Sequence, residues 1–324
     1  MKLIHTLGMT FLFIAANGLP QQAYAQQVFS YSKLCDASAA VALGADHFVV
    51  ADDERNLLQI YQRGQPYPVG SLALSSFLGT KKNQESDLEG AAMIGTRIYW
   101  ISSHGRNKTG KEQQRRYRFF ATEVHPGPIP VLATVGKPYH HLLGDLESAE
   151  EIKTYKLANA AKLAAEAPGG LNIEGLAATP DGNLLIGFRN PVPGGSALIV
   201  PLKNPKDLIS GKKAQFGLPV TLDLGGRGIR SIEPDSGSGY LIVAGPTADS
   251  GNFMLYRWSG KTGQATKVVS HVDFKNFRPE ALFSIPRTGM VQILSDDGGV
   301  RMGNKLCKDR EKSKQSFRSM TIKP

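Results

Sequence analysis

The fold is decided by one phrase at residues 172–188, NIEGLAATPDGNLLIGF. It begins with a polar residue, an apolar residue and an acid, continues as a strand of small residues, and turns at Asp181-Gly182 into a strongly apolar strand. An Asp-Gly pair between two apolar runs is a strong signal for a β-hairpin. The phrase therefore predicts two antiparallel strands, with Glu174 at the start of the first.

The same phrase recurs along the chain. Clear copies lie at 87–101, DLEGAAMIGTRIYWI, and 278–294, RPEALFSIPRTGMVQIL, and weaker ones at 38–50 and 230–243. Each copy is followed by two further strand candidates. Four strands per unit and five units in series predict an all-β fold, a five-bladed β-propeller whose blades bury their faces against one another. A sixth blade would require additional strands in 317–322.

One segment breaks this β pattern. Residues 145–167 are rich in Ala, Glu, Lys and Leu, lack Gly and Pro, and are followed by Pro168-Gly169-Gly170. Such a composition with such a stop predicts a helical insertion between the second and third blades. Some twenty residues cannot bury a core of their own, so 26–324 are expected to form a single propeller domain. We expect the helix, from about 147 to 166, to cover the channel mouth.

The N-terminal residues predict export. Lys2 precedes an apolar run at 3–16, which ends in a polar stretch with small residues at Ala23 and Ala25. This pattern is typical of a secretory signal peptide, here 1–25, and predicts a periplasmic or secreted protein. An uncleaved membrane anchor is the alternative. No later stretch approaches the roughly 20 apolar residues of a transmembrane helix, so no transmembrane segment is expected.

The two cysteines lie near the two ends of the exported chain. Cys35 precedes the first inner strand, and Cys307 follows the last apolar strands. An oxidising compartment allows such a pair to form a disulfide, which would join the first blade to the last. The alternative is a pair of free, buried thiols.

Positive charge is concentrated in two segments. The formal net charge is +10, and the windows 106–118 and 305–324 each contribute +5, so the rest of the chain is close to neutral. This distribution leaves no basic stripe over the body of the protein, and no nucleic-acid partner is expected. Residues 305–324 are interpreted as a basic, solvated tail that can touch an anionic surface.

Polar residues of the repeat are expected to meet at one end of the channel. The start of an inner strand and the end of the next strand lie at the same mouth because the two strands are antiparallel. Alignment of the five copies places Ser38, Glu89, Glu174, Arg230 and Glu280 in equivalent positions. The repeat therefore predicts a ring of three carboxylates and one guanidinium around the entrance.

The ends of the second strands and the loops after them add a polar rim. The wider rim includes Asp52, Asp53, Ser102, Ser103 and Asp297. The candidate ligand-binding residues of the mouth are Glu89, Glu174, Glu280, Arg230, Arg278, His104, Arg106, Arg189, Asn190 and Asp296. A purely structural interpretation remains open, since Glu at an inner strand can accept backbone hydrogen bonds and Asp at a strand end commonly caps a turn.

Carboxylates facing one another across a channel repel unless a positive charge neutralises them. A hard cation with oxygen ligands, Ca²⁺ or Mg²⁺, held by Glu89, Glu174 and Glu280 is one solution. Pairing with Arg230 and Arg278 is another. Both remain open from the sequence.

The phrases at 87–90, 172–175 and 278–281 resemble a bacterial exported family catalogued as domain of unknown function thirty-six-sixteen, and related phrases occur in esterase-like phytase propellers. The resemblance implies a propeller and export but no established activity. Propeller phytases would imply calcium held by carboxylates, with Lys or Arg beside a phosphate, and the Glu ring with Arg106, Arg189 and Arg230 is compatible with that. The dense acidic runs of such enzymes are absent from this sequence.

Other catalytic motifs are missing from the sequence. It contains no Gly-x-Ser-x-Gly, His-Glu-x-x-His or Cys-x-x-Cys pattern. Two hypotheses of different classes follow. The first is a propeller that binds an anionic or polar small molecule, a glycan or a peptide at its mouth. The alternative is a divalent-metal-dependent phosphoesterase, phytase-like or esterase-like, that uses the same mouth.

Overall fold

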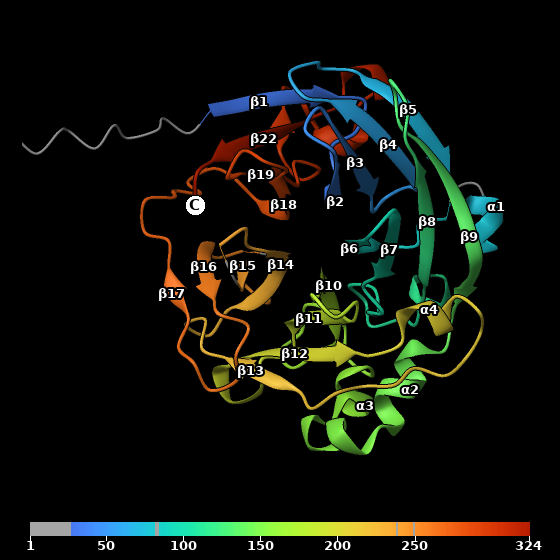
Figure 1. Cartoon of the computed structure of the whole chain (residues 1–324), viewed down its shortest axis with the longest axis vertical. Helices are drawn as coiled ribbons and strands as arrows, with labels where there is room; N and C mark the ends of the chain where they lie inside the picture. The colour runs from blue at the N-terminus through green and yellow to red at the C-terminus, as the bar shows by residue number, and fades with distance from the viewer. Residues whose placement is uncertain (1–26, 82–83, 238, 249) are drawn as a thin grey trace, which may run out of the picture.

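The computed structural model describes residues 27–81, 84–237, 239–248 and 250–324. The predicted signal peptide at 1–25 lies outside these residues and stays a prediction. In the described part of the chain, five four-stranded antiparallel sheets stand around a common centre (Figure 1). The predicted five-bladed β-propeller is confirmed.

Each blade begins with a strand at the channel and continues outward, strand by strand (Figure 1). Blade I consists of β2 (Ala37–Leu43), β3 (His47–Asp52), β4 (Leu57–Gln62) and β5 (Pro68–Ala73). Blade II consists of β6 (Leu88–Ile94), β7 (Arg97–Ser102), β8 (Phe119–His125) and β9 (Val131–Tyr139). Blade III consists of β10 (Asn172–Ala178), β11 (Leu184–Asn190), β12 (Ala197–Leu202) and β13 (Val220–Leu222). Blade IV consists of β14 (Gly228–Pro234), β15 (Tyr240–Gly245), β16 (Met254–Trp258) and β17 (Lys267–Val268).

Blade V is built from both ends of the chain. Its strands, from the channel outward, are β18 (Pro279–Ile285), β19 (Met290–Ser295), β22 (Ser316–Ile322) and β1 (Gln27–Ser32). The six residues of β1 pair along β22, from Gln27 opposite Thr321 to Ser32 opposite Ser316. A sixth blade is therefore wrong, because 317–322 complete the fifth. The interpretation of 305–324 as a solvated tail is also wrong, because its last part is a strand inside a sheet.

A disulfide closes the ring a second time. Cys35 and Cys307 are bonded across 272 residues and both are fully buried, which confirms the predicted pair. Aromatic side chains fill the same seam between blades I and V. Tyr31 lies against Phe48 and Phe317, and Phe48 stacks on Phe283 with ring centroids 5.4 Å apart. The seam thus combines strand pairing, apolar burial and a covalent link.

The helical insertion is not one helix. The chain forms α2 (Leu142–Ser148), the 3₁₀ turn η2 (Glu150–Tyr155) and α3 (Leu157–Ala160), and it leaves helical geometry at Ala149 and Lys156. The buried positions Leu146, Ile152 and Leu157 are six and five residues apart, a spacing that does not keep one face of a continuous helix toward the core.

These helical pieces do not cover the mouth. Leu142, Leu146 and Ile152 belong to a core cluster shared by blades II and III, which includes Phe119 and Phe216. In Figure 1 α2 and α3 lie at the outer edge of the ring. The prediction of a covering helix is wrong for α2, η2 and α3, because their apolar residues are buried against the outer strands. The end of the same segment does reach the mouth, where Ala165 and Glu166 line the channel cavity and Glu166 pairs with Arg189 at 3.6 Å.

The remaining helical elements are single turns. They are α1 (Ser75–Leu78), η1 (Gln114–Arg116), η3 (Pro193–Gly195), α4 (Pro205–Leu208), η4 (Cys307–Asp309) and η5 (Lys312–Lys314), and a small hairpin joins β20 (Arg301–Met302) to β21 (Lys305–Leu306). Within the described residues, no helix has the length and apolarity needed to cross a bilayer.

Candidate functional site

Every inner strand carries a β-bulge at the same place. The pairing with the second strand skips one residue of the inner strand in each blade, and these residues are Ser38, Glu89, Glu174, Arg230 and Glu280. In blade III it also skips Arg189 of the second strand. A bulge leaves its extra residue unpaired and redirects its side chain. The five positions that are equivalent in the repeat are therefore the bulged positions of the five inner strands. Their side chains leave the regular strand pairing.

A cavity of about 1370 Å³ lies at the end of the channel where the inner strands begin. Acidic and basic side chains line it in equal number. The predicted residues that line it are Glu89, Glu174, Glu280, Arg106, Arg189, Arg230, Arg278 and Asp296. The site is therefore strongly polar, and its properties depend on how the charges are distributed.

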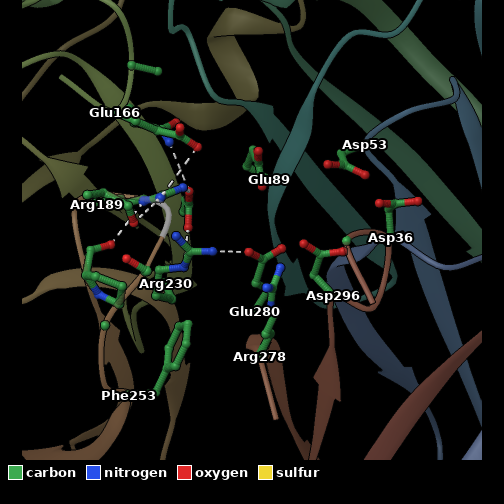
Figure 2. Close-up of a pocket in the computed structure, with 18 of the residues that line it drawn as sticks. Asp36, Asp53, Glu89, Glu166, Arg189, Arg230, Phe253, Arg278, Glu280 and Asp296 are labelled. Carbon is green, nitrogen blue, oxygen red and sulfur yellow. Dashed lines mark hydrogen bonds and ion pairs between the residues drawn. The ribbon is translucent and has the colours of Figure 1, made fainter. Parts of the chain in front are cut away.

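On one side of the cavity, carboxylates and guanidiniums form a continuous chain, which we call the arginine cluster: Arg189, Glu174, Arg230 and Glu280. Nη1 of Arg189 lies 2.9 Å from Oε1 of Glu174, and Nε of Arg230 lies 2.9 Å from Oε2 of the same carboxylate. Nη2 of Arg230 also pairs with Glu280. The cluster links blades III, IV and V (Figure 2).

Arg230 is the centre of this cluster. It is 6% exposed, and its guanidinium lies over the ring of Phe253, 5.6 Å from the centroid. Burial alone would lower its pKa, but the carboxylates of Glu174 and Glu280 raise it, so the side chain stays charged. Glu174 and Glu280 are therefore neutralised by arginine, one of the two solutions left open by the sequence.

The opposite side carries the acidic cluster, which we define as Asp36, Asp52, Asp53, Asp87, Glu89 and Asp296. Figure 2 draws Asp36, Asp53 and Asp296 across the cavity from Arg189. Among the described residues, arginine pairs with only two of the six: Arg55 with Asp52 and Arg116 with Asp87. The other four carboxylates form no ion pair with any lysine or arginine in that part of the chain.

Mutual repulsion and burial make these carboxyl groups weak acids. Burial raises the pKa of Asp36 to about 9, and the nearby charge of Asp296 adds to the effect. Burial also raises the pKa of Asp53 and of Glu89 well above their ordinary values, with Asp36 acting on the first and Glu174 on the second. A cation bound among these groups would remove this destabilisation of the charged forms.

Local backbone features position the acidic cluster. A Cβ atom at Gly298 would overlap the carboxylate of Asp36, so only glycine leaves room for that side chain. Asp87 has a φ of 56°, the left-handed region that is unfavourable for a residue with a side chain. Its carboxylate accepts a hydrogen bond from Ser103 and pairs with Arg116 at 2.9 Å.

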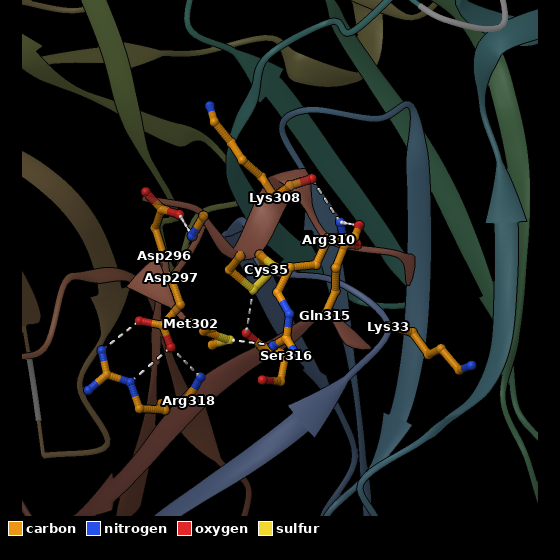
Figure 3. Close-up of a disulfide and its surroundings, with 12 residues drawn as sticks. Lys33, Cys35, Asp296, Asp297, Met302, Lys308, Arg310, Gln315, Ser316 and Arg318 are labelled. Carbon is orange, nitrogen blue, oxygen red and sulfur yellow. Dashed lines mark hydrogen bonds and ion pairs between the residues drawn. A yellow bond between two sulfur atoms is a disulfide. The ribbon is translucent and has the colours of Figure 1, made fainter. Parts of the chain in front are cut away.

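The disulfide supports the same side of the mouth. Asp36 directly follows Cys35, and Lys308 directly follows Cys307; both line the cavity. Figure 3 shows Lys308 and Asp296 beside the disulfide. Nζ of Lys308 lies 2.6 Å from a carboxylate oxygen of Glu54 and does not pair with Asp36. The ring closure therefore also fixes the position of part of the site.

Two of the predicted site residues do not line the cavity. His104 is buried, stacks on Tyr117 and places Nδ1 2.8 Å from the carbonyl oxygen of Ser102; burial lowers its pKa to about 4, so it is neutral. Asn190 donates its amide hydrogens to the carbonyls of Ala165 and Ala167. His104 follows a second strand and Asn190 ends one, as expected, but their polar atoms face the protein and support the rim.

Sequence reasoning missed Asp36 and Asp87 as site residues and placed Asp53 only in the wider rim. Asp36 lies outside the repeated phrase, and only its adjacency to Cys35 would have indicated that it joins the mouth. Asp87 begins one of the copies, two residues before Glu89, so the repeat itself contained a signal for it.

Comparison with known proteins finds one family, without an assigned activity, whose model matches part of the chain. Residues 139–291 match the family described as Protein of unknown function (DUF3616), so the resemblance of the repeated phrases is confirmed for that segment. No curated protein matches the chain. The relation to esterase-like phytases stays a prediction.

Solved structures of similar overall shape are distant in sequence. An oxidoreductase described as a glucose dehydrogenase from Thermus thermophilus is 12% identical, covering 92% of this chain and 100% of that one, with a TM-score of 0.46. The PQQ-bound aldose sugar dehydrogenase of Streptomyces coelicolor is 8% identical, covering 92% and 98%, with a TM-score of 0.45. A luciferin-regenerating enzyme is 8% identical, covering 92% and 95%, also at 0.45.

Proposed function

We propose that this exported propeller binds an anionic small molecule or the anionic group of a glycan or peptide at its mouth, with a divalent cation bridging ligand and protein. The observation that carries the proposal is the segregation of charge in the cavity. The arginine cluster is internally neutralised, whereas four carboxylates of the acidic cluster have no ion pair among the described residues. A divalent ion held by oxygen ligands would compensate them.

Arg278 is the natural second contact for such a ligand. It is exposed at the edge of the cavity and forms no ion pair within the described residues. Burial raises the pKa of Asp296, and the nearby charge of Arg278 is one of the effects that lower it. A guanidinium beside a bound cation can accept a phosphate or carboxylate in two parallel hydrogen bonds. The ligand would then occupy the space between the ion and Arg278.

The predicted location agrees with this proposal. A buried disulfide between distant parts of the chain is compatible with an oxidising compartment, such as the periplasm or the medium. Free calcium is also available to a protein outside the cytoplasm, at the concentrations at which extracellular calcium sites of about 10⁻⁴ to 10⁻³ M affinity fill.

Calorimetric titration tests the proposal. The chelator-treated protein is titrated with Ca²⁺ and with Mg²⁺, and then with inorganic phosphate, glucose 6-phosphate and galacturonate, each with and without the saturating cation. We expect at least one of these anions to bind only when the cation is present. The Arg278→Gln variant should bind that anion at least ten-fold more weakly, since a charge-assisted contact is lost. Arg301→Gln, an exposed arginine outside the cavity, is the matched control.

Two results would overturn the proposal: no cation binding at all, or anion binding that is unaffected by chelator and by the Arg278→Gln change. Equal loss in the Arg278→Gln and Arg301→Gln variants would show that the effect is one of net charge and would also count against the site.

Metal-dependent hydrolysis of a phosphoester is the second candidate function. The observation that favours it is the position of Arg278 beside the acidic cluster, since a cation and a guanidinium can together stabilise charge on a phosphoryl oxygen. Water would add to phosphorus and the ester P–O bond would break. Release of p-nitrophenol from its phosphate mono- and diester with Ca²⁺ or Mg²⁺ measures this directly. Turnover that Asp53→Asn abolishes supports hydrolysis; no turnover in saturating cation rejects it and leaves binding.

A further inference from the structure

The acidic cluster contains two overlapping sets of ligand atoms. One oxygen each from Asp36, Asp52 and Asp53 lie within 4.8 Å of one another, and so do one oxygen each from Asp53, Asp87 and Glu89. Asp53 is the member that both sets share. The first set belongs to the end of blade I, and the second spans the seam between blades I and II.

Two buried carboxylates point independently to missing partners. Asp52 is 1% exposed, and while one of its oxygens pairs with Arg55, Oδ1 is buried without any hydrogen-bond partner in the described structure. Asp36 is 7% exposed, lines the cavity, and has no hydrogen bond or ion pair from its carboxylate to any described residue. Leaving buried carboxylate oxygens unsatisfied is costly, so such oxygens normally have a ligand.

The charge of the cluster determines how many ions it needs. Six carboxylates bring six negative charges, and Arg55 and Arg116 compensate two of them. Four remain, on Asp36, Asp53, Glu89 and Asp296. One divalent ion would leave two uncompensated charges in a largely buried site, whereas two divalent ions neutralise all four.

The ligand set selects calcium. Ca²⁺ accepts six to eight oxygen ligands, several of them carboxylates, at about 2.3 to 2.6 Å, so two oxygens on opposite sides of one ion lie about 4.8 Å apart. Mg²⁺ holds a tight octahedron and usually keeps several waters with one or two carboxylates. Two adjoining sets of three carboxylates each, with ligand oxygens that all lie within 4.8 Å of one another, fit inside such a shell and supply more carboxylates than Mg²⁺ usually takes.

We infer that the acidic cluster binds two calcium ions, one held by Asp36, Asp52 and Asp53 and one by Asp53, Asp87 and Glu89, with the Asp53 carboxylate bridging them. Asp296 lies beside the pair and balances the remaining charge. This inference deepens the proposed function, which requires only one cation at the mouth. The second ion joins blade I to blade II, so calcium should also stabilise the propeller.

Ion stoichiometry tests the inference with Ca²⁺ alone as the probe. Calorimetry and native mass spectrometry on the chelator-treated full chain should find two Ca²⁺ per chain. Asp36→Asn and Asp87→Asn should each leave one ion, because each belongs to a single set. Asp53→Asn should weaken both sites at least ten-fold. Asp207→Asn, a partly exposed carboxylate on α4 with no part in the cavity, is the control and should retain two.

Each outcome separates the inference from the proposed function. A stoichiometry of one in the wild type overturns the paired site but leaves a cation at the mouth, whereas a stoichiometry of zero overturns both. Two ions with loss of only one in Asp53→Asn would overturn the bridge. Circular dichroism and a thiol titration of each variant show whether it is folded with its disulfide intact. If Asp53→Asn fails to fold, the other variants decide the question. Asp36→Asn and Asp87→Asn should each lose one Ca²⁺, and the double variant with both changes should lose both ions.

Discussion

Replacing Arg230 by methionine should destabilise the propeller in a pH-dependent way. Arg230 is the partner of two buried carboxylates, Glu174 at 3% exposed and Glu280 at 7%. Removing one member of a buried ion pair costs about 3 to 5 kcal/mol, because the other charge remains buried. Arg189 still pairs with Glu174 in the variant, so Glu280 is the group left alone. We expect a loss approaching about 3 kcal/mol above pH 8, where Glu280 is ionised in the wild type.

The pH dependence identifies the cause of this loss. Burial already raises the pKa of Glu280 to about 8 in the folded wild type, although the charge of Arg230 lowers it, so removal of Arg230 should raise this pKa further. A carboxyl with a raised folded pKa contributes stability that is present at low pH and is lost as pH rises through that pKa. The difference between wild type and Arg230→Met should therefore be small near pH 6 and should grow as pH rises through 8 and above.

Urea denaturation followed by the fluorescence of the buried Trp100 and Trp258 measures the difference, in chelator and at fixed salt. The double change Arg230→Met with Glu280→Gln should recover much of the stability, because no charge is left unpaired at that position. Arg301→Met is the control for the loss of an arginine. A loss that does not change with pH, or that the double change does not relieve, would refute the account of the arginine cluster.

Three further predictions concern the other side of the mouth. Replacement of Cys35 and Cys307 by serine should lower the free energy of unfolding by about 4 kcal/mol, measured by urea denaturation. The unreduced wild type should show no free thiol when it is unfolded in denaturant. Gly298→Ala should displace the Asp36 carboxylate and weaken calcium binding at least ten-fold in calorimetry while the blades stay folded; unchanged affinity would contradict the packing described. In chelator, thermal stability should fall from pH 5 to pH 9. Burial raises the pKa of Asp52 to about 6 and that of Asp36 to about 9, so in this range both keep protons in the folded state that the unfolded chain has released. Each group lowers the free energy of unfolding by about 1.4 kcal/mol per pH unit until its folded pKa is reached. Calcium affinity should rise over the same range, and a stability that increases with pH would contradict this assignment.

The parts of the fold that depend on local pattern could be predicted from the sequence. Each inner hairpin is contained in some fifteen residues, so the phrase around Glu174 and its copies located the strands and the five equivalent positions, which the structure shows to be bulges. The closure of the ring could not be predicted in the same way. Pairing of β1 with β22 joins residues almost 300 positions apart, and nothing in 317–322 alone distinguishes the third strand of blade V from part of a sixth blade.

The same distinction between local pattern and distant contacts applies to the residues of the site. Glu89, Arg230 and Glu280 lie in the repeat and could be placed at the mouth, but which carboxylates an arginine neutralises depends on side-chain geometry across three blades. Asp36 reaches the mouth through the disulfide and the space left by Gly298, both contacts between distant parts of the chain. The helical insertion was located by composition, whereas its path along the outer edge depends on contacts with blades II and III.

A crystal structure of residues 26–324 grown with calcium tests the central claim most directly, through the anomalous difference map of the mouth. The account predicts anomalous peaks beside Asp53, one toward Asp36 and one toward Glu89, with Arg230 still bridging Glu174 and Glu280. A mouth without any peak at saturating calcium, or a peak between Glu174 and Glu280 in place of Arg230, would contradict it.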